Sequence, residues 1–306
     1  MNGWASLRAD PIPWLLDERQ PNLLWRVLVE LFGRPLDSVA VRRARGAASA
    51  AEPVATLLER LAPDGSWLDP TSTWSRYHGT GWRLVAAVAW GADPDDPRLQ
   101  AGWERLLTEA AGEGGFSLRS GEPPSAPLTA RVVEGLARAG SLCQLRGQEA
   151  LAWLEEEATL DPVTATATLS ALAEELGVGR PGLAARCAEL ILDALGRSGN
   201  PHIGWRRLGH PNLLRTDLLE MLRALAAAGV PFDPRMIFPL QVVQRQQDEL
   251  ARWPLGTAPP RSLPSGDEPT RLGQPSPWLT LHAVRVLLRY SEEASLPRLF
   301  PDRPGV

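Results

Sequence analysis

The sequence predicts an all-α protein whose helices form two concentric rings, an α/α toroid. Three observations lead to this prediction: a phrase that recurs at a period in the mid-forties, an alternation between half-apolar and fully apolar helical segments, and a lack of strand-like alternation. We expect the 306 residues to form one domain, 1–306, with six inner and five to six outer helices.

The recurring phrase ends on an aromatic residue each time. LERLAPDGSW ends at Trp67, LLTEAAGEGGF at Phe116, GRSGNPHIGW at Trp205 and QQDELARW at Trp253. The intervals are 49, 89 and 48 residues, and 89 is close to two periods with a degenerate copy between them. A repeat of this length fits one pair of helices, so we expect helix pairs that pack side by side.

Two kinds of helix alternate within each period. Segments such as PRLQAGWERLLTEA carry one apolar stripe, which is typical of an outer helix with one exposed face. Segments such as TGWRLVAAVAW are apolar nearly all round, which is typical of a helix buried on every side. Residues 20–62 hold the first and most divergent pair. The expected inner helices are 22–32, 80–91, 127–139, 162–176, 212–228 and 277–290.

The links between these helices differ in length. Inner-to-outer links are short, whereas outer-to-inner links are mostly long: 62–79, 111–126, 197–211 and 251–276. The long loops should therefore gather at one mouth, where the inner helices begin. They either carry the function or are tolerated insertions. The loop 254–276 is rich in Pro, Gly and Ser, so we expect it to be the most mobile segment.

Composition and charge exclude several classes of function. The net charge is −4 and the Lys and Arg residues are scattered, so no nucleic-acid partner is expected. Cys143 and Cys187 are the only cysteines, which excludes a disulfide framework and nearly excludes a cysteine-based zinc site. No apolar run approaches the roughly 20 residues of a transmembrane helix, and the N-terminus lacks a signal-peptide pattern. We expect a cytoplasmic protein without cofactor or metal, and its oligomeric state stays open.

Several phrases resemble a known superfamily. DGSW, its variant GGF and GADPDDPR, together with RADPIPWLL, RYHGTGW, PLTARVV and PSPWLTLHAVRVLLR, resemble phrases of the terpenoid cyclase and protein prenyltransferase superfamily of α/α toroids. Squalene–hopene cyclase is its familiar member, and small single-toroid bacterial members are the most similar. The resemblance covers most of the chain and is weak in 141–200 and 251–275. It implies a toroid that holds an apolar, isoprenoid- or polyene-like molecule.

The chain departs from the catalytic motifs of that superfamily. Asp93-Pro94-Asp95-Asp96 spells the D-x-D-D acid motif of class II cyclases, but it lies in a short link before an outer helix. Asp96 is placed to cap that helix ahead of Pro97, so we interpret the motif as a turn. The D-D-x-x-D motif of class I synthases is absent, and neither cysteine is placed to bind zinc with a histidine.

Asp217 and Glu220 are the candidate acids. They stand three residues apart in NLLRTDLLEML and share a helix face. A carboxyl pair in an apolar cavity can keep one member protonated as an acid, and we expect Asp217 to project into the cavity near its mouth. The structural alternative pairs Asp217 with Arg215 or Arg131 and leaves Glu220 in water.

Other polar side chains lie on or just before inner helices. His282 is a candidate base near neutral pH, or a satisfied core group. Tyr77 and His78 lead directly into the inner helix 80–91, and His78 is the best exposed candidate for acid–base work or ligand contact. Both flank the expected mouth.

Cations and tryptophans complete the candidate site. Arg83 and Arg131 could bind an anionic head group, or close ion pairs across the ring with Glu134 or Asp217. The faces of aromatic rings stabilise cations, which suits carbocation cyclisation. The tryptophans expected to line the cavity are Trp25, Trp82 and Trp278.

Two functions follow from these residues. The first is an enzyme of specialised metabolism that binds an apolar isoprenoid- or polyene-like molecule and promotes its metal-free acid–base cyclisation or isomerisation. The second is a non-catalytic toroid that binds a small hydrophobic ligand or a partner protein. An open pocket with a desolvated carboxyl favours the first, and a filled centre with every charge paired favours the second.

Overall fold

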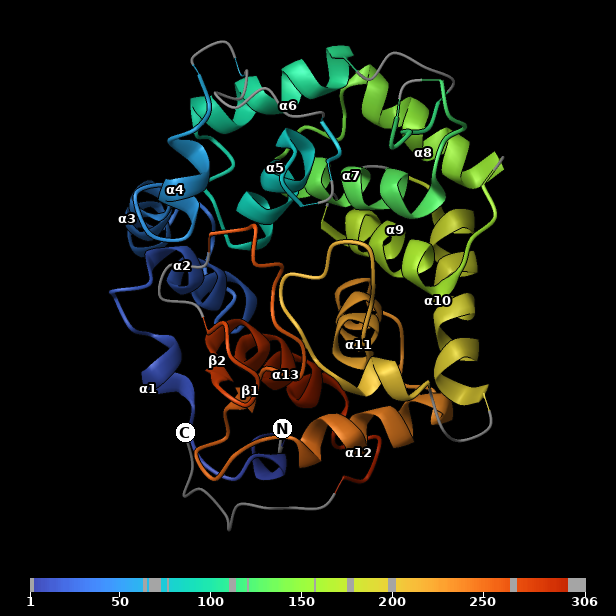
Figure 1. Cartoon of the computed structure of the whole chain (residues 1–306). Helices are drawn as coiled ribbons and strands as arrows, with labels where there is room; N and C mark the ends of the chain where they lie inside the picture. The colour runs from blue at the N-terminus through green and yellow to red at the C-terminus, as the bar shows by residue number, and fades with distance from the viewer. Residues whose placement is uncertain are drawn as a thin grey trace.

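The computed structural model describes residues 3–62, 65, 73–75, 77–109, 114–119, 121–156, 158–174, 179–197, 202–264 and 269–296. Within these residues the protein is mostly helical, with thirteen α-helices, short 3-10 helices and one two-stranded sheet (Figure 1). The expected helical class is confirmed. No helix in this part of the chain is both long and apolar enough to cross a bilayer.

Six helices coincide with the expected inner set: α2 (Pro21–Glu30), α5 (Thr80–Ala89), α7 (Ala126–Arg138), α9 (Pro162–Glu174), α11 (Leu218–Ala227) and α13 (Pro277–Tyr290). Two details differ from the prediction. α11 begins at Leu218 instead of 212, because Asp217 has extended backbone and caps the helix. α2 buries only Asn22, Leu23, Trp25 and Val27 of its ten residues, so it is amphipathic.

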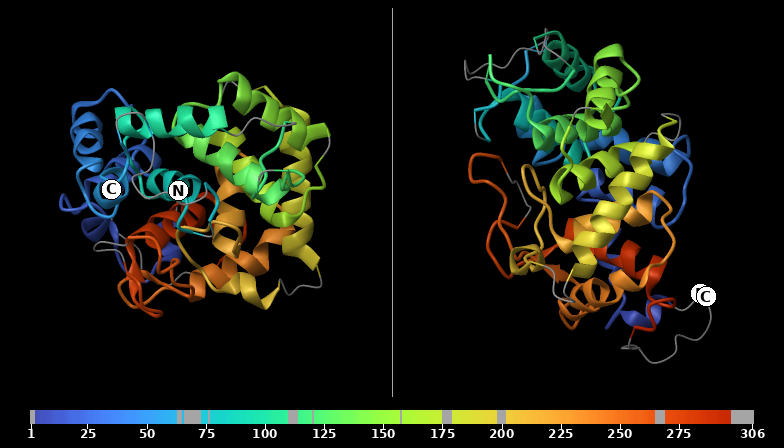
Figure 2. Two further views of the ribbon diagram at one scale, coloured as in Figure 1. Left: turned by 45° about the horizontal axis from the view of Figure 1, so that its top comes forward. Right: turned by 90° about the vertical axis from the view of Figure 1, so that its right-hand side faces the viewer.

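The other helices are mostly half-exposed. They are α1 (Ile12–Leu15), α3 (Val39–Ala48), α4 (Val54–Leu58), α6 (Pro97–Glu109), α8 (Leu145–Glu156), α10 (Pro181–Gly196) and α12 (Ile237–Arg245), with the 3-10 helices η1 (Gly3–Ser6), η3 (Ile203–Arg206) and η4 (Pro234–Met236). α6 shows the expected stripe, since Leu99 and Trp103 are buried while Glu104 is exposed. α6, α8, α10 and α12 lie outside α5, α7, α9 and α11 in Figure 1, and in the right-hand view of Figure 2 α10 lies on the side that faces the viewer.

The six helices that match the expected inner set pack on one another in chain order. α5 contacts α7, α7 contacts α9, α9 contacts α11, α11 contacts α13, and α13 contacts α2. Two hydrogen bonds join α2 to the end of α5: Asn22 donates its side-chain amide to the carbonyl of Trp90 (3.0 Å), and the indole of Trp25 donates to the carbonyl of Gly91 (2.8 Å). α2 therefore contacts both α13 and the residues that follow α5.

Two copies of the recurring phrase make the same contact. The backbone N–H of Phe116 donates to the hydroxyl of Thr129 (2.8 Å), and the N–H of Trp253 donates to the hydroxyl of Thr280 (2.9 Å). Each threonine is the fourth residue of its inner helix, α7 or α13. This shared geometry agrees with an internal repeat. Trp205 lies half-buried in η3, and Trp67 falls outside the described residues.

A small sheet, which the sequence did not predict, closes the loop 254–276. β1 (Trp253–Pro254) pairs antiparallel with β2 (Pro275–Ser276). Between them Gly256 and Thr257 donate backbone N–H groups to the carbonyl of Leu208 (2.8 and 2.9 Å), and Ser262 donates to the carbonyl of Tyr77 (3.0 Å). These bonds tie the described part of the loop to its neighbours, which argues against its being the most mobile segment. Residues 265–268 lie outside the described residues.

Candidate functional site

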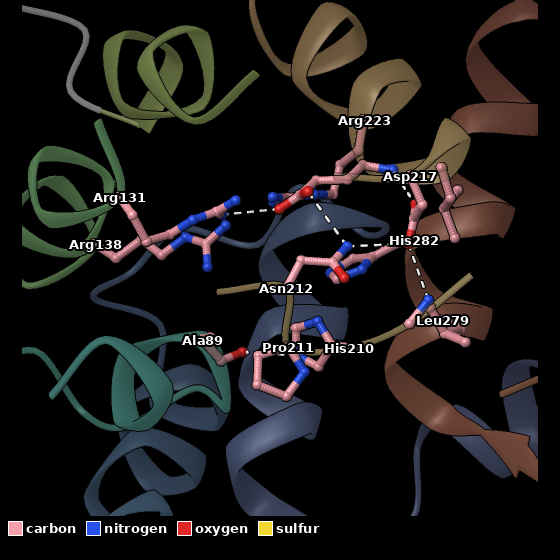
Figure 3. Close-up of a pocket in the computed structure, with 13 residues that line it drawn as sticks. Ala89, Arg131, Arg138, His210, Pro211, Asn212, Asp217, Arg223, Leu279 and His282 are labelled. Atoms are coloured by element: carbon pink, nitrogen blue, oxygen red, sulfur yellow. Dashed lines mark hydrogen bonds and ion pairs between the residues drawn. The ribbon is translucent and has the colours of Figure 1, made fainter. Parts of the chain in front are cut away.

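A polar pocket lies among α5, α7, α11, α13 and the segment before α11 (Figure 3). The volume that the centre of a water molecule can occupy in the pocket is about 20 Å³, so the pocket holds about one or two waters. The pocket is lined by Ala89, Arg131, Arg138, Gly209, His210, Pro211, Asn212, Asp217, Leu219, Glu220, Arg223, Leu279 and His282. The expectation of an apolar cavity is therefore wrong for this pocket, because most of its lining is charged or polar.

Asp217 is the buried cap of α11. Its Oδ1 accepts the backbone N–H of Glu220 (2.9 Å), and its Oδ2 accepts the N–H of Gly209 (2.9 Å) and the side-chain amide of Asn212 (3.0 Å). In the part of the chain that the structure covers, no cation forms an ion pair with this carboxyl. Burial raises its pKa to about 6, the negative charge of Glu220 adds to the rise, and the three hydrogen bonds oppose it.

Glu220 lies in the same pocket and is buried. The structural alternative, which left Glu220 in water, does not fit this position. Its Oε1 accepts Nη1 of Arg131 (2.9 Å) and its Oε2 accepts the amide of Asn212 (3.2 Å). The amide of Asn212 thus donates to both Asp217 and Glu220. The three-residue spacing does bring the two carboxyls together, although one caps the helix and the other belongs to it.

Arg131 is buried and fully engaged. Nη1 donates to Glu134 and Glu220, Nε donates to the carbonyl of Leu213 (2.8 Å), and Nη2 donates to the carbonyl of Arg215 (3.1 Å). Burial alone would lower its pKa, but the charges of Glu220 and Glu134 raise it above the ordinary value. Arg131 does pair with Glu134, but within α7 and not across the ring as expected; its pair with Glu220 is the one that joins two helices. Neither Arg131 nor Arg215 pairs with Asp217, as the structural alternative had expected, among the described residues.

Ion pairs continue from the pocket to the C-terminal ends of α2, α7 and α9. Glu134 also accepts Arg138 (2.6 Å) and Arg223 (3.4 Å), and its pKa is lowered because these arginines and Arg131 outweigh the opposing effect of burial. Glu174 pairs with Arg138 (3.9 Å) and Arg26 (3.2 Å). Glu30 pairs with Arg26 (3.4 Å) and Arg285 (2.7 Å). We call these residues the central network: Arg26, Glu30, Arg131, Glu134, Arg138, Glu174, Glu220, Arg223 and Arg285.

Two neutral imidazoles line the pocket beside Trp278. The ring of His210 stacks on Trp278 at 5.1 Å, and its Nε2 lies 3.0 Å from the carbonyl of Ala89, which assigns the hydrogen to Nε2. Burial lowers the pKa of His210 to about 3, and Arg138 adds to the effect.

His282 meets His210 edge-on at 5.2 Å. Burial, followed by the charge of Arg223, lowers the pKa of His282 well below 6.5. A lowered pKa keeps His282 neutral near pH 7 and argues against its acting as a base there, which stays a prediction.

The remaining aromatic candidates pack elsewhere. Trp82 is fully buried, lies edge-on to Trp74 (5.2 Å) and Tyr77 (5.6 Å), and donates its indole N–H to the carbonyl of Trp74 (3.3 Å). Trp25 belongs to a separate cluster between α2 and α3, with Arg26 over its ring at 4.6 Å. None of these residues lines the polar pocket, and Trp278 contacts two residues that do, His210 and His282.

His78 and Arg83 also lie outside the pocket lining. His78 is exposed in the turn before α5, as predicted. Arg83 is half-buried on α5. Neither shares the site of Asp217.

The D-x-D-D residues form a turn, as predicted. Arg45 binds Asp93 (2.6 Å) and Asp95 (2.7 Å), and Oδ1 of Asp96 accepts the backbone N–H of Arg98 (2.9 Å) at the start of α6. Each of the three carboxylates pairs with an arginine at or near the protein surface. An acid that must stay protonated could not be kept in this place.

The sequence did not single out Asn212, Arg138 or Arg223, and considered His210 only as a zinc ligand. Among the described residues no three His, Cys, Asp or Glu side chains are grouped to hold a metal ion. No protein-family model matches the chain, and no curated protein matches it. The site has to be interpreted from its own chemistry.

Proposed function

We propose that the chain is an α/α toroid similar to the terpenoid cyclases, and that its polar pocket is the site of metal-free acid–base chemistry in the cytoplasm. The order of contacts from α2 to α13, with α6, α8, α10 and α12 outside, supports the toroid. The reaction is an isomerisation or a cyclisation, because both need only a proton delivered and a proton removed.

One observation carries the catalytic proposal. Asp217 is 2% exposed, lines a pocket, is held by neutral donors and has no ion pair among the described residues, and burial raises its pKa to about 6. A carboxyl in this environment carries a proton in part of the molecules near neutral pH and can deliver it as a general acid. Asn212 and Glu220 position it, and His282 offers a neutral imidazole on the same lining.

The pocket restricts what can reach that acid. Room for about one or two waters admits only the end of a molecule. We therefore propose that a polar, reacting end enters the pocket and that the apolar isoprenoid- or polyene-like body stays outside it. Hydrophobic contacts of the body would then come from residues beyond the pocket lining.

The second candidate is a non-catalytic toroid that binds a hydrophobic ligand or a partner protein. The central network favours it, because its buried charges pair with one another. Asp217, which lacks a cation partner within the described part of the chain, favours the first candidate.

Solvent deuterium tests the proposal without knowledge of the substrate. The protein is incubated in D2O with a metabolite extract, and mass spectrometry searches for compounds that gain deuterium in a protein-dependent manner. Protonation by an exchangeable acid would place a solvent deuteron in the product, and Asp217→Asn should abolish this gain because the amide cannot donate the acid proton.

The matched control is Asp161→Asn. Asp161 is exposed and accepts the N–H of Thr164 (2.8 Å) at the start of α9, so the change alters another helix cap by the same isosteric substitution. This variant should keep the deuterium gain. Gain that survives in Asp217→Asn would overturn the role of this carboxyl, and no gain with the wild type would favour the second candidate.

A further inference from the structure

We propose that Arg223, with His282, forms a subsite for a small monoanionic group, a carboxylate, inside the polar pocket. The inference deepens the proposed function, on which it rests, because it names the polar end that approaches Asp217. It concerns binding, so it can be tested separately from any reaction.

Arg223 is the least engaged cation of the pocket. It lies on α11, is 7% exposed, and lines the pocket. Its guanidinium has five N–H donors, yet among the described residues it makes a single hydrogen bond, from Nη2 to Oε1 of Glu134 at 3.4 Å. Arg131, by contrast, uses all three nitrogens. Arg138 also makes one hydrogen bond to Glu134, but at 2.6 Å, and it pairs with Glu174 as well. A buried guanidinium with unused donors is costly unless a ligand or water satisfies them.

The charges around the pocket are unequal when Asp217 is protonated. The central network holds five arginines, Arg26, Arg131, Arg138, Arg223 and Arg285, against four glutamates, Glu30, Glu134, Glu174 and Glu220. Within this network one positive charge then lacks a counterpart. Glu134 is shared by three arginines, and Arg223 makes the longest of these contacts. One negative charge bound at Arg223 would restore the balance.

Shape and the remaining donor select a carboxylate. The pocket has room for about one or two waters, which suits a carboxylate group and is small for a phosphate with its substituent. The planar fork of an arginine matches the two oxygens of a carboxylate. His282 is neutral, lines the same pocket, and makes no hydrogen bond to the described residues, so it can donate one to the ligand. Figure 3 shows His282 and Arg223 on adjoining sides of the pocket.

Formate is the probe, and saturation-transfer NMR on its single proton is the measurement. The wild type should show transfer that acetate competes away. Arg223→Gln should weaken formate binding at least tenfold, the loss expected when one charge-assisted hydrogen bond is removed. Arg235→Gln is the control, because Arg235 pairs with Glu189, Asp193 and Asp233 at the surface, and it should bind formate like the wild type.

Chain length identifies the source of the carboxylate. If affinity rises from formate to acetate to hexanoate, the site binds the end of a larger molecule; if only formate binds, it takes a free anion, and both results support the subsite. Transfer that is absent in the wild type, or equal in Arg223→Gln, would overturn it. If Arg223→Gln does not fold, Arg223→Lys, which keeps the charge and loses the fork, must still weaken formate binding.

The outcomes for this site and for the proposed acid are separable. Formate binding with no deuterium gain would retain the anion subsite and remove the reaction. Deuterium gain that persists in Arg223→Gln, together with no formate binding, would retain the acid and remove the subsite.

Discussion

Replacing Asp217 by Asn should change how stability depends on pH, and the structure gives the sign. Burial raises the folded pKa of this carboxyl from 3.8 to about 6. Between these values the folded protein holds a proton that the unfolded chain has released, so the contribution of Asp217 is fully present below pH 3.8 and is lost as the pH rises through 6. A difference of about two pH units corresponds to about 3 kcal/mol.

Asn stays neutral throughout, so the variant lacks this loss. The free energy of unfolding of Asp217→Asn minus that of the wild type should therefore rise by about 2.5 kcal/mol from pH 4 to pH 7, because part of the contribution is already lost at pH 4. The amide also turns one NH2 group toward the N–H of Gly209 or Glu220, which costs about 1 kcal/mol. That cost is the same at every pH and does not enter the slope.

Urea unfolding followed by tryptophan fluorescence at pH 4, 5, 6 and 7, at constant ionic strength, measures this difference. Asp161→Asn reports what the loss of an exposed cap carboxyl does by itself. A difference that is flat, or that falls as the pH rises, would refute the reasoning, because it would mean that the folded protein stabilises the ionised form of Asp217.

Four further predictions concern other residues. Arg131→Met should cost about 3–5 kcal/mol in urea unfolding, because it leaves buried carboxylates without their cation, whereas Arg235→Gln should cost about 1 kcal/mol or less. His210→Gln should reduce the loss of stability on acidification in urea unfolding, because a folded pKa of about 3 makes the wild-type contribution present above pH 6.5 and lost toward pH 3. Asp93→Asn with Asp95→Asn should leave the deuterium gain intact and lower the melting temperature modestly, since only a surface turn is weakened. Treatment with a chelator should not change the melting temperature, because the described residues contain no group of ligands for a metal ion; a large decrease would contradict this.

Periodicity located the inner helices well because burial on all sides is a local property of a segment. TGWRLVAAVAW and VTATATLSALA became α5 and α9 almost to the residue. The same pattern placed the start of α11 too early, because Leu213 and Leu214 extend the apolar pattern of the helix toward the N-terminus. A cap at Asp217, with bonds from Gly209 and Asn212, decides where this helix begins.

The polar pocket was harder to predict, because its contacts join distant parts of the chain. Arg131 and Glu220 are 89 residues apart, and no spacing rule links them. One signal was present: Arg131, Glu134 and Arg138 share a face of an otherwise apolar α7, spaced three and four residues apart. Charges on a helix buried all round need partners on neighbouring helices, which predicts a buried ion network without naming its members.

The two-residue strands left no pattern that sequence reasoning could detect. Trp253–Pro254 and Pro275–Ser276 are too short for alternation, and proline is depleted in strands. Thr280 supports the position of the first strand, because its hydroxyl accepts the backbone N–H of Trp253.

The central claim is that Asp217 keeps its proton up to about pH 6 inside the polar pocket, whereas an ordinary aspartate loses it near pH 3.8. Infrared difference spectroscopy measures this directly, as the band of a protonated carboxyl that is present in the wild type and missing in Asp217→Asn. We predict that this band is lost with a midpoint near pH 6, since burial raises the pKa of Asp217 to about 6. A band that is already absent at pH 5 would contradict the account.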